Sequence, residues 1–324
     1  MGRPEPGCHS EPSPAVRNPA APPLAQGNPL PGSLYAILSC LTCWCLLVGL
    51  AAGCGARTRL PDLRQQAVKY NDEGYQYYRE SRWRLARHKF TQALDLNRLI
   101  DHRPGIAANL NNLGAVAQEQ GELKDAARYY QEALTLQREI GDPAGLSEAL
   151  NNLGTAYAGM GQWNEARDLY AEALTYTRRL RPGPLLALTL THQGDVARHD
   201  QNYPQALALY REALSIDQAR KNRAGMAIRW ARLGRTYLDM SDYVSARLYL
   251  LRALEESRRQ ELTGGVIDAL DGLTHLALAQ DNRPEARLHG ERLLKLYQAR
   301  NQTQQAEKLA AILELKGQPE AAKP

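Results

Sequence analysis

The sequence repeats itself every 40 residues from residue 65 onward, and this period constrains the fold more than any other feature. An alanine column consists of Ala86, Ala126, Ala166, Ala206, Ala246 and Ala286. A glycine column consists of Gly74, Gly114, Gly154, Gly194 and Gly234, and Thr274 takes its place in the sixth unit. Periods of 20 to 50 residues indicate supersecondary units that stack on one another.

Each 40-residue unit predicts two helices. In the second unit, apolar residues recur at spacings of three, four and seven and form one stripe per helix: Leu110, Leu113 and Ala117, then Leu123, Ala126, Tyr130, Ala133 and Leu134. Residues 120–122, 160–162, 200–202, 240–242 and 280–282 contain glycine, asparagine or aspartate and predict the turn between the helices. The small columns let two helices approach closely, and we expect the large column of Phe90, Tyr130, Tyr170, Tyr210 and Leu250 to fill the remaining space.

The third unit carries Asn151, Asn152, Leu153, Gly154 and Tyr157, followed by Trp163, Ala166, Tyr170 and Ala173. This spacing resembles the tetratricopeptide repeat family, and the longer period resembles its extended subclass in kinesin light chains and bacterial peptide-sensing regulators. The resemblance implies an all-α fold: a right-handed α-solenoid of about six antiparallel helix pairs over residues 65–301. A C-terminal capping helix is expected at 302–316, with a disordered tail at 317–324. Glu73 and Thr274 depart from the pattern in the terminal units, as terminal units often do.

The N-terminal region has a different composition. Residues 1–33 contain nine of the 18 prolines, so we expect them to be disordered or not translated. Residues 34–52 follow without a charge, and about 20 apolar residues suffice to cross a bilayer. Ala52 and Gly53 before Cys54 resemble the lipobox of bacterial lipoprotein signal peptides, although Ala51 stands where leucine is usual.

The lipobox resemblance implies cleavage after Gly53, a lipid on Cys54 and a linker at 54–64. With Gly55 after the cysteine, it also implies the bacterial cell envelope, at the periplasmic face of the outer membrane. The residues leave an uncleaved membrane anchor at 34–52 open as the alternative.

The resemblance places the first helix of each pair on a concave groove. The asparagines at the predicted groove positions are Asn71, Asn111, Asn112, Asn151 and Asn152. Asparagine is a poor helix former, and its amide both donates and accepts hydrogen bonds, so we expect this ladder to hold the main chain of a bound peptide. The alternative is that the asparagines satisfy neighbouring helices and bind nothing.

A second predicted groove feature is basic. It comprises His192, Arg198, Arg232 and Arg235, and it favours an acidic ligand near the fourth and fifth units. Tyr75 and Tyr78 supply an expected apolar contact in the first unit. The alternative is that the arginines pair with Asp195 and Asp239.

Several function classes are disfavoured by what the sequence lacks. All five cysteines precede residue 55, which excludes a thiolate metal site or a cysteine nucleophile from the repeats. Sequence motifs for phosphate loops, zinc proteases and serine hydrolases are missing, so we expect no enzyme, no metal and no cofactor. A net charge of +5 is too small to argue for nucleic acid as a partner.

These features together predict a membrane-anchored scaffold for protein–protein interaction that binds polypeptide segments and serves the assembly of envelope complexes. The alternative is a peptide-sensing signalling module whose solenoid changes shape when a ligand binds.

Overall fold

The computed structural model describes residues 60–300 and 302–315, all within the second of the chain's two compact units, residues 58–324. The described residues form thirteen α-helices and no strand. Cys54, the apolar run at 34–52, the leader and the tail at 317–324 lie outside the described residues. None of the described helices is long and apolar enough to cross a membrane.

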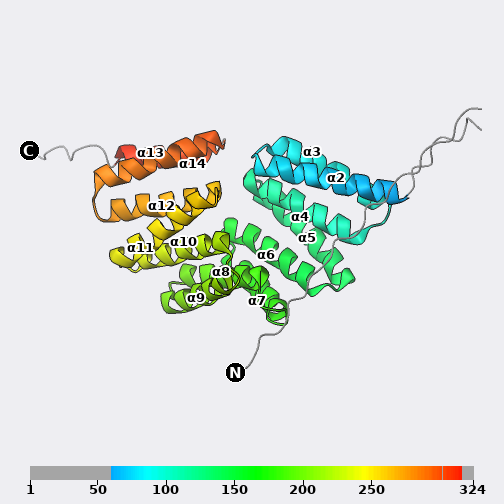
Figure 1. Ribbon diagram of the computed structural model, residues 1–324, viewed down its shortest axis with the longest axis horizontal. Helices are drawn as coiled ribbons and strands as arrows, with labels where there is room; N and C mark the ends of the chain where they lie inside the picture. Colours follow the sequence, from blue (N-terminus) through cyan, green and yellow to red (C-terminus); the bar gives the residue numbers. More distant parts are fainter. Residues whose placement is uncertain (1–59, 301, 316–324) are drawn as a thin grey trace, which may run out of the picture. The chain divides into compact units, whose positions relative to one another are not determined.

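The helices follow one another with short turns between them (Figure 1). Their bounds are α2 Leu60–Arg79, α3 Trp83–Leu99, α4 Arg103–Glu119, α5 Leu123–Ile140, α6 Pro143–Gly159, α7 Trp163–Thr177, α8 Pro184–His199, α9 Tyr203–Ala219, α10 Arg223–Asp239, α11 Tyr243–Arg259, α12 Thr263–Ala279, α13 Arg283–Ala299 and α14 Thr303–Leu315. Each even-numbered helix from α2 to α12 packs most extensively against the helix that follows it, and α14 packs on α13. The predicted all-α solenoid of six antiparallel pairs is confirmed.

The first helices of the pairs form the inner layer of the solenoid. Helices α4, α6, α8 and α10 each contact the first helix of the next unit, whereas the second helices of neighbouring units share no comparable contact among the described residues. Helices that stand closer together lie on the inside of a curved stack. The second helices α3, α5, α7, α9, α11 and α13 therefore form the outer layer.

The glycine column allows the two helices of a pair to approach closely, as predicted. A Cβ atom added to Gly114, Gly154 or Gly194 would lie 2.5 Å from a ring carbon of the tyrosine opposite. These tyrosines are Tyr130, Tyr170 and Tyr210, and all three are buried. The interior of the second, third and fourth units is therefore built from a small residue facing a large one.

The turn inside each pair uses the left-handed backbone conformation at the same position of every unit. Gly121 and Gly161 have φ of 77° and 79°, and Gln201 and Ser241 adopt 60° and 61° at the equivalent positions. The sequence pattern predicted these turns from glycine, asparagine and aspartate. The structure keeps the turn where glycine is missing, because the packed helices on both sides hold the backbone there.

One side-chain contact joins units that are far apart in the sequence. The Nη2 atom of Arg300, which follows α13, donates a hydrogen bond to Oε2 of Glu119 in the last turn of α4, at 3.1 Å. The Arg300 guanidinium also lies 5.8 Å from the centre of the Trp83 ring at the start of α3. The sixth unit therefore contacts the first two units directly.

Candidate binding surface

Four side chains of the first two units, three asparagines and a tyrosine, form a hydrogen-bonded cluster that links α2 to α4. The hydroxyl of Tyr75 donates to Oδ1 of Asn112 at 2.8 Å, and Nδ2 of Asn112 donates to Oδ1 of Asn71 at 2.8 Å. Asn109 donates to the same Asn71 oxygen at 2.9 Å. Both ends of the Asn112 amide are therefore engaged within the protein.

The other predicted asparagines differ in their accessibility. Asn111 and Asn151 are buried, and Nδ2 of Asn151 donates to Oγ1 of Thr189 in α8 at 2.8 Å. Asn152 is half-buried. The structure thus directs Asn112 and Asn151 toward neighbouring helices, and it leaves Asn71 and Asn152 partly at the surface.

The two tyrosines of the first unit have different environments. Tyr75 is 47% exposed, and its ring meets Phe90 edge to face with ring centres 5.4 Å apart. Tyr78 is half-buried against Trp83, with ring centres 5.3 Å apart. Burial, reinforced by the negative charge of Glu119, raises the pKa of Tyr78 to about 12. Tyr75 is therefore the more exposed of the two tyrosines.

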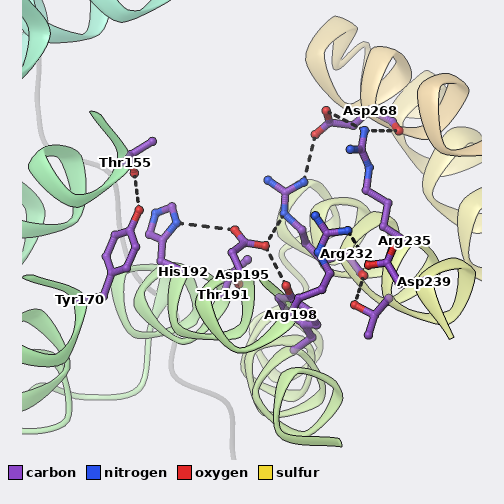
Figure 2. Close-up of polar contacts among 12 residues, drawn as sticks. Thr155, Tyr170, Thr191, His192, Asp195, Arg198, Arg232, Arg235, Asp239 and Asp268 are labelled. Atoms are coloured by element: carbon purple, nitrogen blue, oxygen red, sulfur yellow. Dashed lines mark hydrogen bonds and ion pairs between the residues drawn. The ribbon is translucent and has the colours of Figure 1, made fainter. Parts of the chain in front are cut away.

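The predicted basic feature is an ion-pair network on α8, α10 and α12 (Figure 2). Nε of Arg232 lies 3.0 Å from Asp195 in the preceding unit, and its Nη1 lies 3.8 Å from Asp268 in the following unit. The negative charge of Asp195 raises the pKa of Arg232 further above its ordinary value, against the opposing effect of burial. Arg232 therefore links three consecutive units.

The other two arginines are also paired. Nη2 of Arg235 lies 2.9 Å from Asp271, and Nη1 of Arg198 lies 3.1 Å from Asp239. The pairing with Asp195 and Asp239 that the sequence left open is thus present. Four aspartates face three arginines here. An acidic ligand would have to displace one of these aspartates.

His192 lies between Tyr170 and Asp195 in the same network (Figure 2). Its imidazole stacks on the Tyr170 ring with centres 4.8 Å apart, and its Nδ1 is 3.9 Å from Asp195. Burial lowers the pKa of His192 to about 4, although the charge of Asp195 acts in the opposite direction. The imidazole is therefore neutral at neutral pH. The hydroxyl of Tyr210 donates to Oδ1 of Asp195 at 2.8 Å.

A polar position at the junction of consecutive units, buried in four of the five units that carry it, was missed by the sequence reasoning. At this position the chain carries Asn97, Gln137, Thr177, Asp217 and Ser257, all near the end of a second helix. Asn97 donates to Asn109 at 2.7 Å, and Asp217 lies 3.3 Å from Nε of Arg229. The recurrence of a polar residue at this position every 40 residues was the sequence signal that could have identified it. It was overlooked because polar residues near helix ends are ordinarily solvated.

The described residues contain no group of three or more His, Cys, Asp or Glu side chains that could hold a metal ion. The side chains described above on the first helices are polar, aromatic and charged.

The order and packing of the helices define an α-solenoid of paired helices. The model of the tetratricopeptide repeat family matches residues 65–139 and 145–219. The predicted tetratricopeptide repeats are thus confirmed over these two stretches. This repeat is generally a non-catalytic unit of protein–protein interaction, and no catalytic family is indicated.

Solved structures share this architecture. The apo form of RapI has 13% sequence identity and a TM-score of 0.63, covering 83% of this chain and 94% of its own. A Rap protein complexed with competence and sporulation factor has 13% identity and a TM-score of 0.58, covering 78% and 74%. The APC/C hetero-tetramer Cut9–Hcn1 has 18% identity and a TM-score of 0.53, covering 75% and 42%. No curated protein sequence matches the chain.

Proposed function

We propose that this chain is a scaffold that binds segments of other proteins on the surface of its first helices. The observation that carries the proposal is the exposed ring of Tyr75 beside small side chains. At the positions equivalent to Tyr75 in the next two units, α4 carries Ala115 and α6 carries Thr155, and both side chains are half-buried. Small side chains there leave the two helices accessible next to a large aromatic side chain, which is a residue type enriched in binding hot spots.

The polar environment supports the same proposal. Asn71 and Asn152 keep part of their amides at the surface, and an amide can pair with a peptide main chain. The ion pairs of Arg198, Arg232 and Arg235 link α8, α10 and α12 within the same layer of first helices. A Rap protein of the same fold forms a complex with competence and sporulation factor, which agrees with a binding role for such a solenoid.

Site-specific photocrosslinking tests where partners bind. A photoreactive amino acid in place of Ala115 is expected to capture a partner in intact cells, and the same group in place of Gln131, exposed on α5, is expected to capture none. Tyr75→Ala should lower the yield of the Ala115 adduct at least about tenfold, because loss of a central aromatic contact costs about 2 kcal/mol or more. Adducts of equal yield from both positions would place the binding surface elsewhere.

The proposed scaffold is anchored to a membrane through the region before the repeats. The uncharged run at 34–52 and the Ala52-Gly53-Cys54 sequence support this, and both lie outside the described residues. The location proposed for the scaffold is the bacterial cell envelope, at the periplasmic face of the outer membrane, in the assembly of an envelope complex.

Mass spectrometry of the mature protein tests the anchor. The expected N-terminus is Cys54 carrying acyl chains, since a single chain gives only marginal membrane binding. Detection of an intact segment 34–52 in the membrane fraction would instead establish the uncleaved anchor and reject lipid attachment.

A further inference from the structure

Helix α11 exposes an apolar stripe on the outer layer of the solenoid. Val244 is 83% exposed, Leu248 48% and Leu251 46%. Residues at spacings of four and seven share one face of a helix. Leu288 occupies the Leu248 position in the next unit, on α13, and it is 56% exposed. Four large apolar side chains therefore face outward on the last two second helices.

The equivalent positions of earlier units are not apolar in this way. Helix α5 carries Lys124, Arg128 and Gln131 there, and α7 carries Asn164, Asp168 and Ala171. These helices form the same contacts with their first helices without an outward apolar stripe. The packing of a unit thus does not require the stripe on α11.

The exposed charges around the stripe are predominantly positive. Six cationic side chains are exposed on α11 from Arg252 onward and on α13 from Arg287 onward. They are Arg252, Arg258, Arg259, Arg287, Arg292 and Lys295. The exposed carboxylates on the same stretches are Glu255 and Glu291, and Glu255 pairs with Arg259. Six cations against two carboxylates leave a net charge of +4. Two copies of the chain facing each other here would bring like charges together.

We propose that this outer face of α11 and α13 lies on an anionic lipid surface. Val244, Leu248, Leu251 and Leu288 enter between the lipid headgroups, and the surrounding arginines contact lipid phosphates. Exposed leucines flanked by arginine and lysine are typical of helices that lie in a membrane interface. A convex outer layer meets a flat surface along one or two adjacent helices, and the stripe is confined to two adjacent second helices. This interaction depends only on the outer face and not on the proposed anchor at Cys54.

Fluorescence quenching by brominated lipids tests the proposal in the full chain. The vesicles contain equal parts of phosphatidylglycerol and phosphatidylethanolamine. One variant carries Leu248→Trp, and the matched control carries Ala208→Trp at the equivalent exposed position of α9. Subtraction of the parent chain removes the native tryptophans, including Trp44 in the apolar run. We expect quenching of the added tryptophan at position 248 and none at position 208.

The charge requirement is tested in the same assay. Adding Arg252→Glu and Arg292→Glu to Leu248→Trp is expected to reduce the quenching at least about fivefold, because each cation near an anionic surface contributes on the order of 1 kcal/mol. Vesicles of phosphatidylcholine alone should give little quenching. Equal quenching at positions 208 and 248, or no quenching at 248 in anionic vesicles, would overturn the proposal. An acidic protein partner would then be the remaining candidate for this face.

Discussion

Replacing Asp217 by alanine is expected to lower the free energy of unfolding by about 3–5 kcal/mol, the usual cost of removing one member of a buried ion pair. Asp217 has no exposed side-chain surface, and its partner Arg229 is 4% exposed. Without Asp217, the Arg229 guanidinium remains buried and loses its ion-pair partner. Burial already lowers the pKa of Arg229, and the negative charge of Asp217 opposes that shift.

The first junction of the chain supplies a neutral pair for comparison. The double variant Asp217→Asn with Arg229→Asn reproduces the amide pair of Asn97 and Asn109, which are hydrogen-bonded at 2.7 Å. We expect this variant to recover most of the stability lost in Asp217→Ala, because an amide pair requires no buried charge. Asn222 donates to Asp217 at 2.7 Å and can donate equally to an amide oxygen.

Urea denaturation followed by circular dichroism measures these differences. Ser257→Ala is the matched control, since Ser257 occupies the position of Asp217 in the next unit and is buried. Its hydroxyl has no hydrogen-bond partner among the described residues, so its removal should change stability by less than about 1 kcal/mol. A stability of Asp217→Ala within about 1 kcal/mol of the parent chain would show that the pair contributes little.

The second large effect is expected for Gly194→Ala, which should lower stability by about 1–3 kcal/mol. Alanine is the better helix former by about 1 kcal/mol, so propensity alone predicts the opposite sign. The added Cβ would lie 2.5 Å from the Tyr210 ring, however, and Tyr210 is fully buried. The hydrogen bond from Tyr210 to Asp195 also restrains the ring from moving aside.

Gly264→Ala tests whether the Tyr210 contact is the cause. A Cβ at Gly264, in the first turn of α12, would meet nothing within 4 Å. The same chemical change should therefore leave stability unchanged or raise it slightly, as measured by the midpoint of urea denaturation. Equal destabilisation by both substitutions would attribute the effect to the backbone rather than to the contact with Tyr210.

The fold was predictable because it rests on side-chain size at fixed intervals. Gly154 lies against Tyr170 because one belongs to the glycine column and the other to the column of large side chains, and both columns are visible in the sequence. The partners of polar side chains were harder to predict, because they depend on how one first helix lies against the next. Asn112, for example, bonds to Asn71 and Tyr75 of the preceding unit rather than facing solvent.

In the structure, these polar side chains find their partners at a regular separation in the sequence. First helices of neighbouring units pair side chains that are separated by 33 to 41 residues, as in Arg235 with Asp268 and Arg198 with Asp239. The sequence left open the pairing of these arginines with Asp195 and Asp239. It did not indicate the bridge from Arg232 to Asp268, because that bridge requires the following unit to lie on the same side of α10.

The contact between Arg300 and Glu119 changes how the array is expected to unfold. In an open repeat array each unit is stabilised only by its neighbours, so terminal units have one neighbour and fray first. Here the sixth unit is also held by the second, across 181 residues of sequence. Opening of the C-terminal unit thereby weakens the N-terminal units as well, and the two ends of the array lose structure as a coupled pair instead of independently.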